Sequence, residues 1–201
     1  RNMYRYGAKW TGVDISKEQI DMAKAMSQGM DIQYLVSPIE GLSLKENSFD
    51  VITACQCFWY FNHEETAPLF RNLLAPNGSL AVMCMEWLPF EDRIAGASEA
   101  LVLKYSPQWT GAGETMRPIH IPECYFDYFK VIYHNEYKVN VPFTRESWNG
   151  RMKSCRGIGA SLSPKEIEQW EKEHIRLLSE IAPESFNVLH YAAFAELKRL
   201  D

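Results

Sequence analysis

Polar side chains follow two short apolar runs, where the carboxyl ends of parallel strands would place a ligand. Asp14 comes directly after Lys9 to Val13, and Cys55 and Gln56 come directly after Phe49 to Ala54. In dinucleotide-type folds, an acid at the end of the second strand accepts hydrogen bonds from ribose hydroxyls. We therefore predict that Asp14 binds a ribose. The alternative is that Asp14 only helps to cap the helix that follows it.

The other stretch with chemical potential is locally basic and lies in an otherwise acidic chain, at residues 148–159. If it is helical, Trp148, Arg151 and Cys155 lie on one face, and the two glycines beyond them would let the helix end hinge as a lid. An aromatic ring beside a guanidinium can hold a planar acid, so we predict an anionic or carboxylate-bearing ligand paired with Arg151 or Arg156. The alternative is a solvated basic face balanced by nearby acids.

The cysteines and histidines are not spaced as metal ligands. Cys55 and Cys57 form a C-x-C pair, but no second pair follows at zinc-like spacing, and no histidine lies four residues from another. We predict no metal site and reduced, packed thiols. His174 falls on the apolar stripe of a helix, which favours a hydrogen-bonded packing role over a catalytic one.

The elements that position these residues follow an α/β order. Phe49 to Ala54 is apolar and β-branched, as strands buried in parallel sheets are. A helix from about Glu64 to Leu74 follows, and Pro76-Asn77-Gly78 turns the chain into a second buried strand, Leu80 to Met85. Two strands joined through a helix form a right-handed parallel crossover.

Upstream, Lys9 to Val13 reads as a strand, and Ser16 with Gln19 predicts a capping box for a helix that runs to about Met26. Ile32 to Val36 reads as the next strand. Arg1 to Tyr6, which ends at Gly7, reads as the last turns of a helix.

Downstream, helical spacing is visible around Ile94 to Tyr105, and Val131 to Val141 alternates as a strand does. Thr144 is a plausible N-cap, and Ser163 to Glu166 forms a second capping box with proline at the first helical position. The stretch from Phe186 to Leu197 could form a closing strand, antiparallel to its neighbour, but its Ala-rich end with Glu and Lys would also suit a helix.

Three of these features together resemble the central part of a class I S-adenosylmethionine-dependent methyltransferase of the small-molecule type. They are Phe49-Asp50 opening a strand, the aromatic cluster Phe58 to Phe61, and Leu74 to Gly78 before the next strand. The resemblance extends upstream to Gly12 to Ser16 and covers about the first half of the chain. It implies an α/β fold with a doubly wound, mostly parallel Rossmann-like sheet, helices on both faces and a helical cap insertion, and it favours a strand for the first half of the stretch from Phe186 to Leu197. We expect one domain, 1–201, with cap segments at about 87–129 and 143–162.

The resemblance implies S-adenosylmethionine as cofactor. Pro38 stands where many relatives carry an aspartate that faces the adenine, so that contact is absent or is taken over by Glu40, while Ile39 offers its backbone N–H. The residues expected at the cofactor are Asp14, Ile15, Ile39, Glu40, Cys55 and Gln56.

The same resemblance implies a small-molecule acceptor under the cap. A carboxylate acceptor needs no base, whereas a hydroxyl or amine acceptor would need one of His120, His134 or Tyr105. No catalytic residue is assigned. The residues expected at the acceptor are Trp59, Tyr105, Trp148, Arg151 and Arg156.

The Gly-rich loop of this family lies after its first strand, and no G-x-G sequence stands ahead of Asp14. Without that strand, two apolar strand edges would lie unpaired in the middle of the sheet. We therefore expect both the strand and the loop in a segment that precedes Arg1.

Composition limits the other possibilities. The 201 residues are 46% hydrophobic, enough for one globular domain, and the formal net charge of -5 argues against a broad basic surface for nucleic acid. The odd number of cysteines, five, fits a reducing compartment, and no apolar run is long enough to span a membrane. We expect a cytoplasmic protein with a small-molecule partner and no nucleic-acid or membrane partner. The sequence leaves the oligomeric state open, and a homodimer is one possibility.

Two other functions compete with this reading. A non-catalytic module that keeps the fold for binding or dimerisation would lack the Gly-rich loop. A nicotinamide-dependent dehydrogenase would share the role of Asp14, but it would not show the Phe49-Asp50 and Leu74 to Gly78 pattern.

Overall fold

The computed structural model describes residues 1–201 as two compact units. Unit 1 comprises residues 1–81, 121–132 and 196–201, and unit 2 comprises residues 82–120 and 133–195. Three strands contain residues of both units: β4 (Leu74–Trp87), β5 (Phe129–Thr144) and β6 (Ser185–Arg199). None of the helices is both long enough and apolar enough to cross a bilayer.

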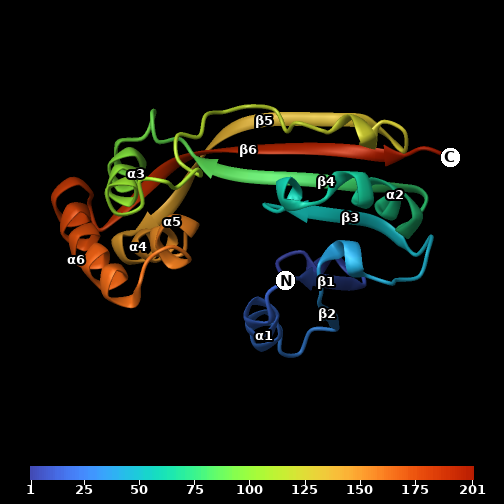
Figure 1. Ribbon diagram of the computed structural model, residues 1–201, viewed down its shortest axis with the longest axis horizontal. Helices are drawn as coiled ribbons and strands as arrows, with labels where there is room; N and C mark the ends of the chain where they lie inside the picture. Colours follow the sequence, from blue (N-terminus) through green and yellow to red (C-terminus); the bar gives the residue numbers. More distant parts are fainter. The chain divides into compact units, whose positions relative to one another are not determined.

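The strands form two sheets. β1 (Trp10–Asp14) and β2 (Ile32–Val36) pair in parallel, with Asp14 opposite Val36, so both carboxyl ends lie at the same edge. The second sheet has the order β3-β4-β6-β5, where β3 is Phe49–Cys55. Figure 1 shows β6 running opposite to β4, as expected for an antiparallel closing strand.

Gly12 allows the β1–β2 pair to pack closely. The ring of Tyr34 lies over Gly12, and a Cβ atom there would stand 2.8 Å from the Tyr34 Cδ1 atom. The Tyr34 hydroxyl lies 2.7 Å from Ser27 Oγ at the end of α1 (Lys17–Met26), which ties that helix to β2.

The unit 1 helices follow the predicted local signals. Ser16 caps α1 by accepting the Gln19 N–H at 3.2 Å, but the predicted capping box is only half formed, because the Ser16 N–H binds Asp14 and not the Gln19 side chain. Phe70 and Leu73 are buried on α2 (His63–Leu73), as the predicted apolar face requires. The remaining helical turns of this unit are short 3-10 segments: η1 (Tyr4–Tyr6), η2 (Ile39–Gly41), η3 (Phe58–Tyr60) and η4 (Glu123–Tyr125).

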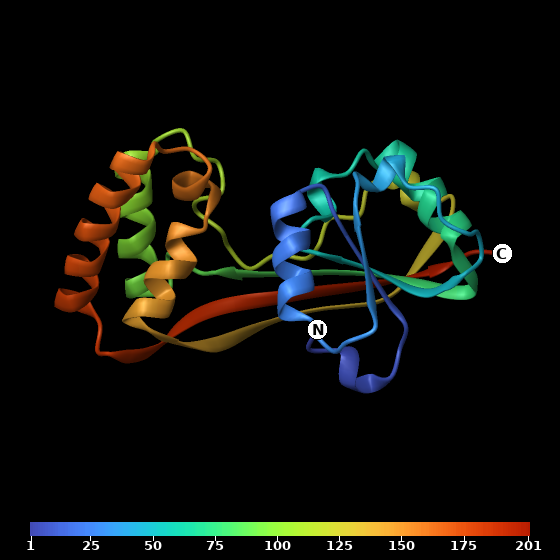
Figure 2. The same ribbon diagram turned by 90° about the horizontal axis from the view of Figure 1, so that it is seen from below.

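The unit 2 helices are α3 (Arg93–Tyr105), α4 (Arg145–Lys153), α5 (Arg156–Gly159) and α6 (Pro164–Ile181), drawn together in Figure 2. The predicted caps are present, with reciprocal capping boxes at Thr144 and Ser163. These helices enclose a core whose largest buried members are Trp87, Trp148, Met152, Ile158, Trp170 and Leu178.

The mixed α/β organisation is as predicted, and three local expectations are wrong. β6 is a strand over its whole length, because its Ala-rich second half, Ala192 to Leu197, alternates between buried and half-buried positions inside the sheet. β4 begins at Leu74, ahead of the predicted turn, with Asn77 in the left-handed region at φ 63°. Arg1 to Tyr6 contains only a single 3-10 turn, which ends at Gly7 with φ 80°.

The expected lid hinge beyond Cys155 is also wrong. Gly157 is buried, and a Cβ atom there would stand 2.7 Å from Val102 Cγ1 and 2.8 Å from Trp109 Cγ. Cys155 does not continue α4 but is the N-cap of α5. The two glycines therefore serve close packing of α5, not opening of a helix end.

Candidate functional site

Asp14 ends β1 with an exposed side chain. Its Oδ1 atom accepts the Ser16 N–H at 2.8 Å, and its carbonyl oxygen accepts the Ser37 N–H at 3.0 Å. The capping alternative is therefore partly realised. The second carboxylate oxygen has no hydrogen-bond partner in the chain, so one oxygen is available to a ligand.

The residues expected at the cofactor after β1 and β2 differ in exposure. Ile15 is 74% exposed, whereas Ile39 and Glu40 are half-buried in η2. Glu40 Oε1 accepts the Asn62 N–H at 3.0 Å, at the N-cap of α2. One Glu40 oxygen is thus already hydrogen-bonded at the N-terminus of α2.

Side chains at the end of β3 lie within electrostatic reach of Asp14. Burial raises the pKa of the Cys57 thiol to about 11, and the neighbouring Cys55 and Asp14 groups add to that rise. Cys55 itself is exposed, and Gln56 has a left-handed backbone at φ 58°. The structure therefore gathers Asp14 and the Cys55-to-Cys57 segment at one edge of unit 1.

The aromatic cluster after β3 divides into core and surface. Phe58 is 2% exposed and packs against Tyr125 at a ring distance of 5.2 Å. Trp59 is 44% exposed and Tyr60 is 59% exposed. Trp59 is therefore not a core residue, and its acceptor role stays a prediction.

Trp148 was predicted to contact the acceptor, and the structure contradicts this. Its side chain has no exposed surface, and its Nε1–H donates to Ser98 Oγ at 2.9 Å. A helical pattern shows which residues share a face, but not whether that face meets a ligand or a core.

Tyr105, another predicted acceptor residue, lies in the last turn of α3 against the unit 2 core. Burial, together with Glu173 of α6, raises its pKa, so the phenol is protonated at neutral pH. Lys104 lies 5.5 Å from the ring centroid. This environment disfavours Tyr105 as a base.

The two predicted arginines have different surroundings. The Arg151 guanidinium on α4 is half-buried and lies 4.9 Å from the ring centroid of Trp87. Arg156 is exposed at the start of α5. The aromatic partner of Arg151 is thus Trp87, which the sequence pattern did not pair with it.

His190 is a buried histidine that the sequence reasoning missed. It lies on β6 and is 3% exposed, with Nδ1 at 2.9 Å from the Val188 carbonyl oxygen. His120 and His134, the histidines considered as bases, are exposed. The signal that could have found His190 was its position in an alternating strand, two residues after buried Val188.

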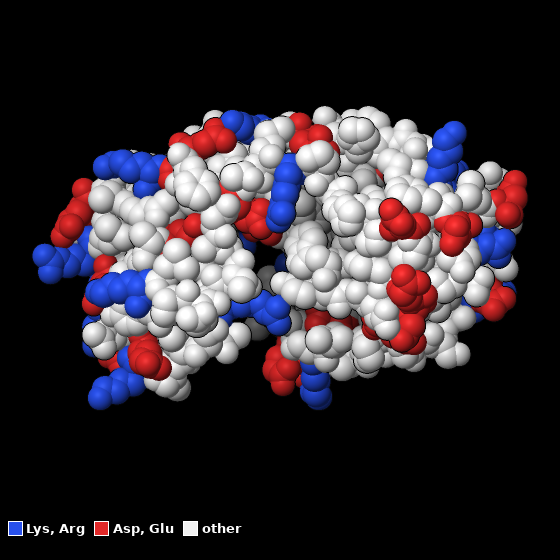
Figure 3. Space-filling model, turned by 45° about the horizontal axis from the view of Figure 1, so that its top comes forward, with Lys and Arg blue, Asp and Glu red and all other residues white.

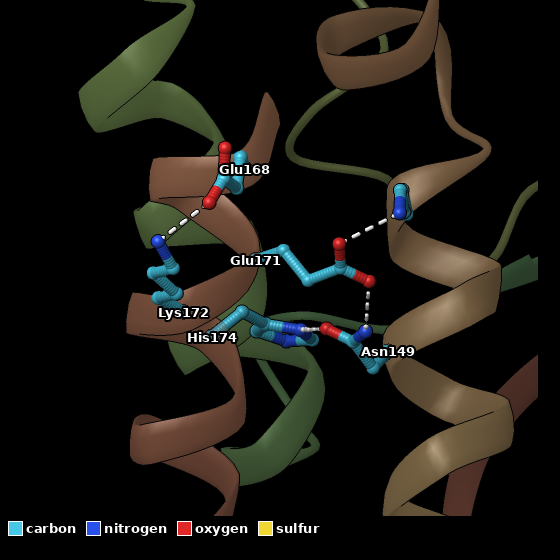
Figure 4. A network of polar contacts seen from close by, with 6 residues as sticks. Asn149, Glu168, Glu171, Lys172 and His174 are labelled. Carbon is cyan, nitrogen blue, oxygen red and sulfur yellow. Dashed lines mark hydrogen bonds and ion pairs between the residues drawn. The ribbon is translucent and has the colours of Figure 1, made fainter. Parts of the chain in front are cut away.

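The predicted packing role of His174 is confirmed. Its Nδ1 lies 2.8 Å from Asn149 Oδ1 and its Nε2 lies 3.0 Å from Ser98 Oγ. Figure 4 shows this network continuing from Asn149 to Glu171, which also binds Lys153 at 2.7 Å. The arrangement has the order of a Ser-His-Asn triad, but all three side chains are buried and the serine already accepts a tryptophan N–H, so it joins α3, α4 and α6.

A hollow of about 460 Å³ on unit 2 carries no ionisable side chain. It is lined by Pro142, Phe143, Thr144, Ser147 and residues 185–187. On the face of the molecule in Figure 3, basic and acidic side chains are interspersed without a continuous basic surface. The preference for a small-molecule partner over nucleic acid stays a prediction.

Comparison with known proteins agrees with this geometry. Residues 1–82 match the family described as methyltransferase domain. The match covers 82 of the 201 residues. No curated protein sequence matches the chain.

Solved structures share the fold of this chain, and two of them are described as putative methyltransferases. A putative type II methyltransferase from Anaeromyxobacter dehalogenans has a TM-score of 0.54 at 14% identity, over 94% of this chain and 79% of that one. A putative methyltransferase from Bacillus halodurans has a TM-score of 0.50 at 10% identity, over 95% and 83%. The YcgJ protein from Bacillus subtilis has a TM-score of 0.50 at 16% identity, over 99% and 86%. The predicted class I methyltransferase domain and its Rossmann-like α/β fold are confirmed.

Proposed function

We propose that this methyltransferase uses S-adenosylmethionine to methylate a small molecule that carries an anionic group, such as a carboxylate. The observation that carries the cofactor assignment is the Asp14 carboxylate at the carboxyl end of β1, with one oxygen free of partners in the chain. The acceptor class rests on Arg151, a half-buried cation stacked on Trp87.

The residues of unit 1 fit the cofactor. The free Asp14 oxygen suits a ribose hydroxyl. Ile15, which is exposed, and Ile39, which is half-buried, offer apolar surface to a purine ring, and Cys55 and Gln56 suit the methionine portion. Glu40 keeps one oxygen for the adenine amino group, because the other accepts the Asn62 N–H.

When bound, this cofactor supplies a methyl group that is already activated on a sulfonium. The protein therefore has to align the acceptor and exclude water, and needs little acid–base chemistry. Asp14 orients the ribose, and the fixed turn at Gln56 presents the end of β3 in one conformation. The cation of Arg151 holds an anionic acceptor.

Isothermal titration of the protein with S-adenosylmethionine tests the cofactor assignment. We expect Asp14→Asn to weaken binding by roughly 1–3 kcal/mol, the cost of losing hydrogen bonds to a charged group. Asparagine can still accept the Ser16 N–H, so the strand end stays in place.

Asp21→Asn is the matched control. Asp21 lies on α1 and pairs only with the exposed Lys17, so its loss should leave cofactor affinity unchanged. Equal affinity of wild type and a folded Asp14→Asn variant would remove Asp14 from the site.

A further inference from the structure

Arg151 is a cation without a matching anion in the chain. Its guanidinium is half-buried over the Trp87 ring, at 4.9 Å, and it forms no ion pair within the protein. Glu99 is the one buried acid of the chain, and its carboxylate is already engaged. Glu99 accepts the Trp87 Nε1–H at 2.8 Å with one oxygen and the Gly113 N–H at 2.8 Å with the other.

The Trp87 indole, over which the guanidinium lies, is held in place by its own contacts. The indole is held by Glu99 at its N–H and packs edge-on against Trp148 at 5.8 Å. A guanidinium stacked on an aromatic face keeps its N–H donors in the plane of the group, directed outward. Those donors match a carboxylate or a similar oxyanion in a bidentate pair.

His190 is an acceptor without a matching donor. Because the Val188 carbonyl can only accept, Nδ1 must carry the proton, and the lone pair is left on Nε2. Nε2 forms no hydrogen bond within the chain, and it is not among the fully buried polar atoms that lack a partner, so it keeps some solvent access although His190 as a whole is 3% exposed. The donor of a ligand can therefore meet this nitrogen in place of water.

The groups around His190 keep it neutral. Phe143 of β5 stacks on the imidazole at 5.9 Å, and Trp148 of α4 meets it edge-on at 6.2 Å. Burial lowers the pKa of His190, and the hydrogen bond to the Val188 carbonyl opposes this effect in part. The nearby Arg151 cation lowers the pKa further, against a smaller opposing effect of Asp92. The Asp92 oxygens are occupied by the N–H groups of Ile94, Ala95 and Leu189.

The two unmatched groups belong to one cluster within unit 2. Trp148 contacts both Trp87, under Arg151, and the ring of His190. The charge of Arg151 is also close enough to lower the pKa of His190. The cluster thus presents an unpaired cation and an unpaired hydrogen-bond acceptor, with aromatic rings between them.

We propose that Arg151 and His190 bind one small ligand that combines a carboxylate with a separate O–H or N–H group. The guanidinium pairs with the carboxylate, and His190 Nε2 accepts the hydrogen bond of the O–H or N–H. The half-buried ring of Phe143, which stacks on His190, favours a planar ligand. The inference rests on the proposed function only where it identifies this ligand with the methyl acceptor.

Calorimetric titration with hydroxybenzoates tests the proposal without any cofactor. 3-Hydroxybenzoate and 4-hydroxybenzoate carry both groups, benzoate lacks the donor, and 3-methoxybenzoate replaces it with an ether. We expect at least one hydroxybenzoate to bind roughly 10-fold or more tightly than benzoate or 3-methoxybenzoate, because the unmade hydrogen bond leaves Nε2 unpaired.

The variants separate the two contacts. Arg151→Met should weaken all the benzoates by roughly 10-fold or more, whereas His190→Phe should bring the hydroxybenzoates down to the affinity of benzoate. Arg176→Met is the control, since Arg176 is exposed and pairs with Glu180 on the surface of α6. The proposal is overturned if no hydroxybenzoate binds better than benzoate, or if a folded Arg151→Met variant binds them unchanged.

Two further measurements test the proposal if a variant does not fold and separate it from the proposed function. If His190→Phe does not fold, the 15N resonance of His190 Nε2 in the wild type should shift when the preferred hydroxybenzoate is added, and an unmoved resonance contradicts the proposal. A separate titration with S-adenosylmethionine reports on the proposed function. Hydroxybenzoate selectivity without cofactor binding would retain this site and reject the methyl-transfer assignment.

Discussion

Residues of one type have opposite environments in this chain, and their partners decide what each can do. His174 has a partner on each ring nitrogen, whereas His190 has a partner on only one. Arg156 is exposed, whereas Arg151 is half-buried over an indole. The sequence predicted the packing role of His174 from its apolar stripe, but it could not distinguish the two arginines or find His190, because the partners of these residues come from distant segments.

Buried His174 should make the stability of the protein depend on pH. Burial lowers its pKa from the ordinary 6.5 to about 4. Between these values the unfolded chain binds a proton that the folded protein does not. The stabilisation is therefore complete above about pH 6.5 and is lost as the pH falls towards about 4. From about pH 7 to about pH 5, this residue should remove about 2 kcal/mol from the free energy of unfolding.

Urea unfolding at those two pH values measures the effect. In His174→Gln, which can still form hydrogen bonds but does not titrate, the pH-dependent loss should shrink by about 2 kcal/mol. His134→Gln is the control, because the side chain of His134 is 67% exposed. An unchanged pH dependence in His174→Gln would mean that His174 titrates normally in the folded protein.

At the scale of elements, the ends of helices were predictable and the ends of strands were not. Ser16, Thr144 and Ser163 act as N-caps because a cap needs only residues close in sequence. β4 and β6 extend beyond their predicted bounds because neighbouring strands supply their hydrogen bonds. The same dependence on distant partners hid His190, whose burial follows from the place of β6 inside the sheet.

Two glycines near the end of α4 should respond oppositely to alanine. A Cβ atom at Gly157 would stand within 2.8 Å of both Val102 and Trp109, so Gly157→Ala should destabilise the protein by about 1–3 kcal/mol through overpacking. A Cβ atom at Gly150, inside α4, meets nothing within 4 Å, so Gly150→Ala should stabilise it by up to about 1 kcal/mol through helix propensity.

Denaturant unfolding of the two variants gives both values against the same wild type. The opposite signs follow from packing at one site and backbone entropy at the other. If Gly157→Ala were neutral or stabilising, α5 would not be closely packed against α3. That result would support the helix hinge that was expected from the sequence.

At the scale of the whole molecule, the chain forms two compact units that share three strands. The family match covers 1–82, which includes most of unit 1 and only the first residue of unit 2. The sequence therefore predicted the helices and strands of unit 1 well, since the motifs there are local, while its cofactor-binding residues stay a prediction. The residues of unit 2 follow no comparable pattern, and their contacts emerged only from the fold.

The shared strands predict that the two units unfold together. β4, β5 and β6 cannot lose their sheet hydrogen bonds in one unit without fraying the strands that continue in the other. S-adenosylmethionine at about 100 times its dissociation constant should then add about 2.7 kcal/mol to one common transition. Far-ultraviolet circular dichroism follows the whole chain, and fluorescence reports mainly on unit 2, which holds the buried Trp87, Trp148 and Trp170. Added cofactor should raise the unfolding midpoint by the same amount in both signals, and Gly157→Ala in unit 2 should lower that common midpoint. A cofactor-dependent shift seen by circular dichroism but not by fluorescence would show that the units unfold independently.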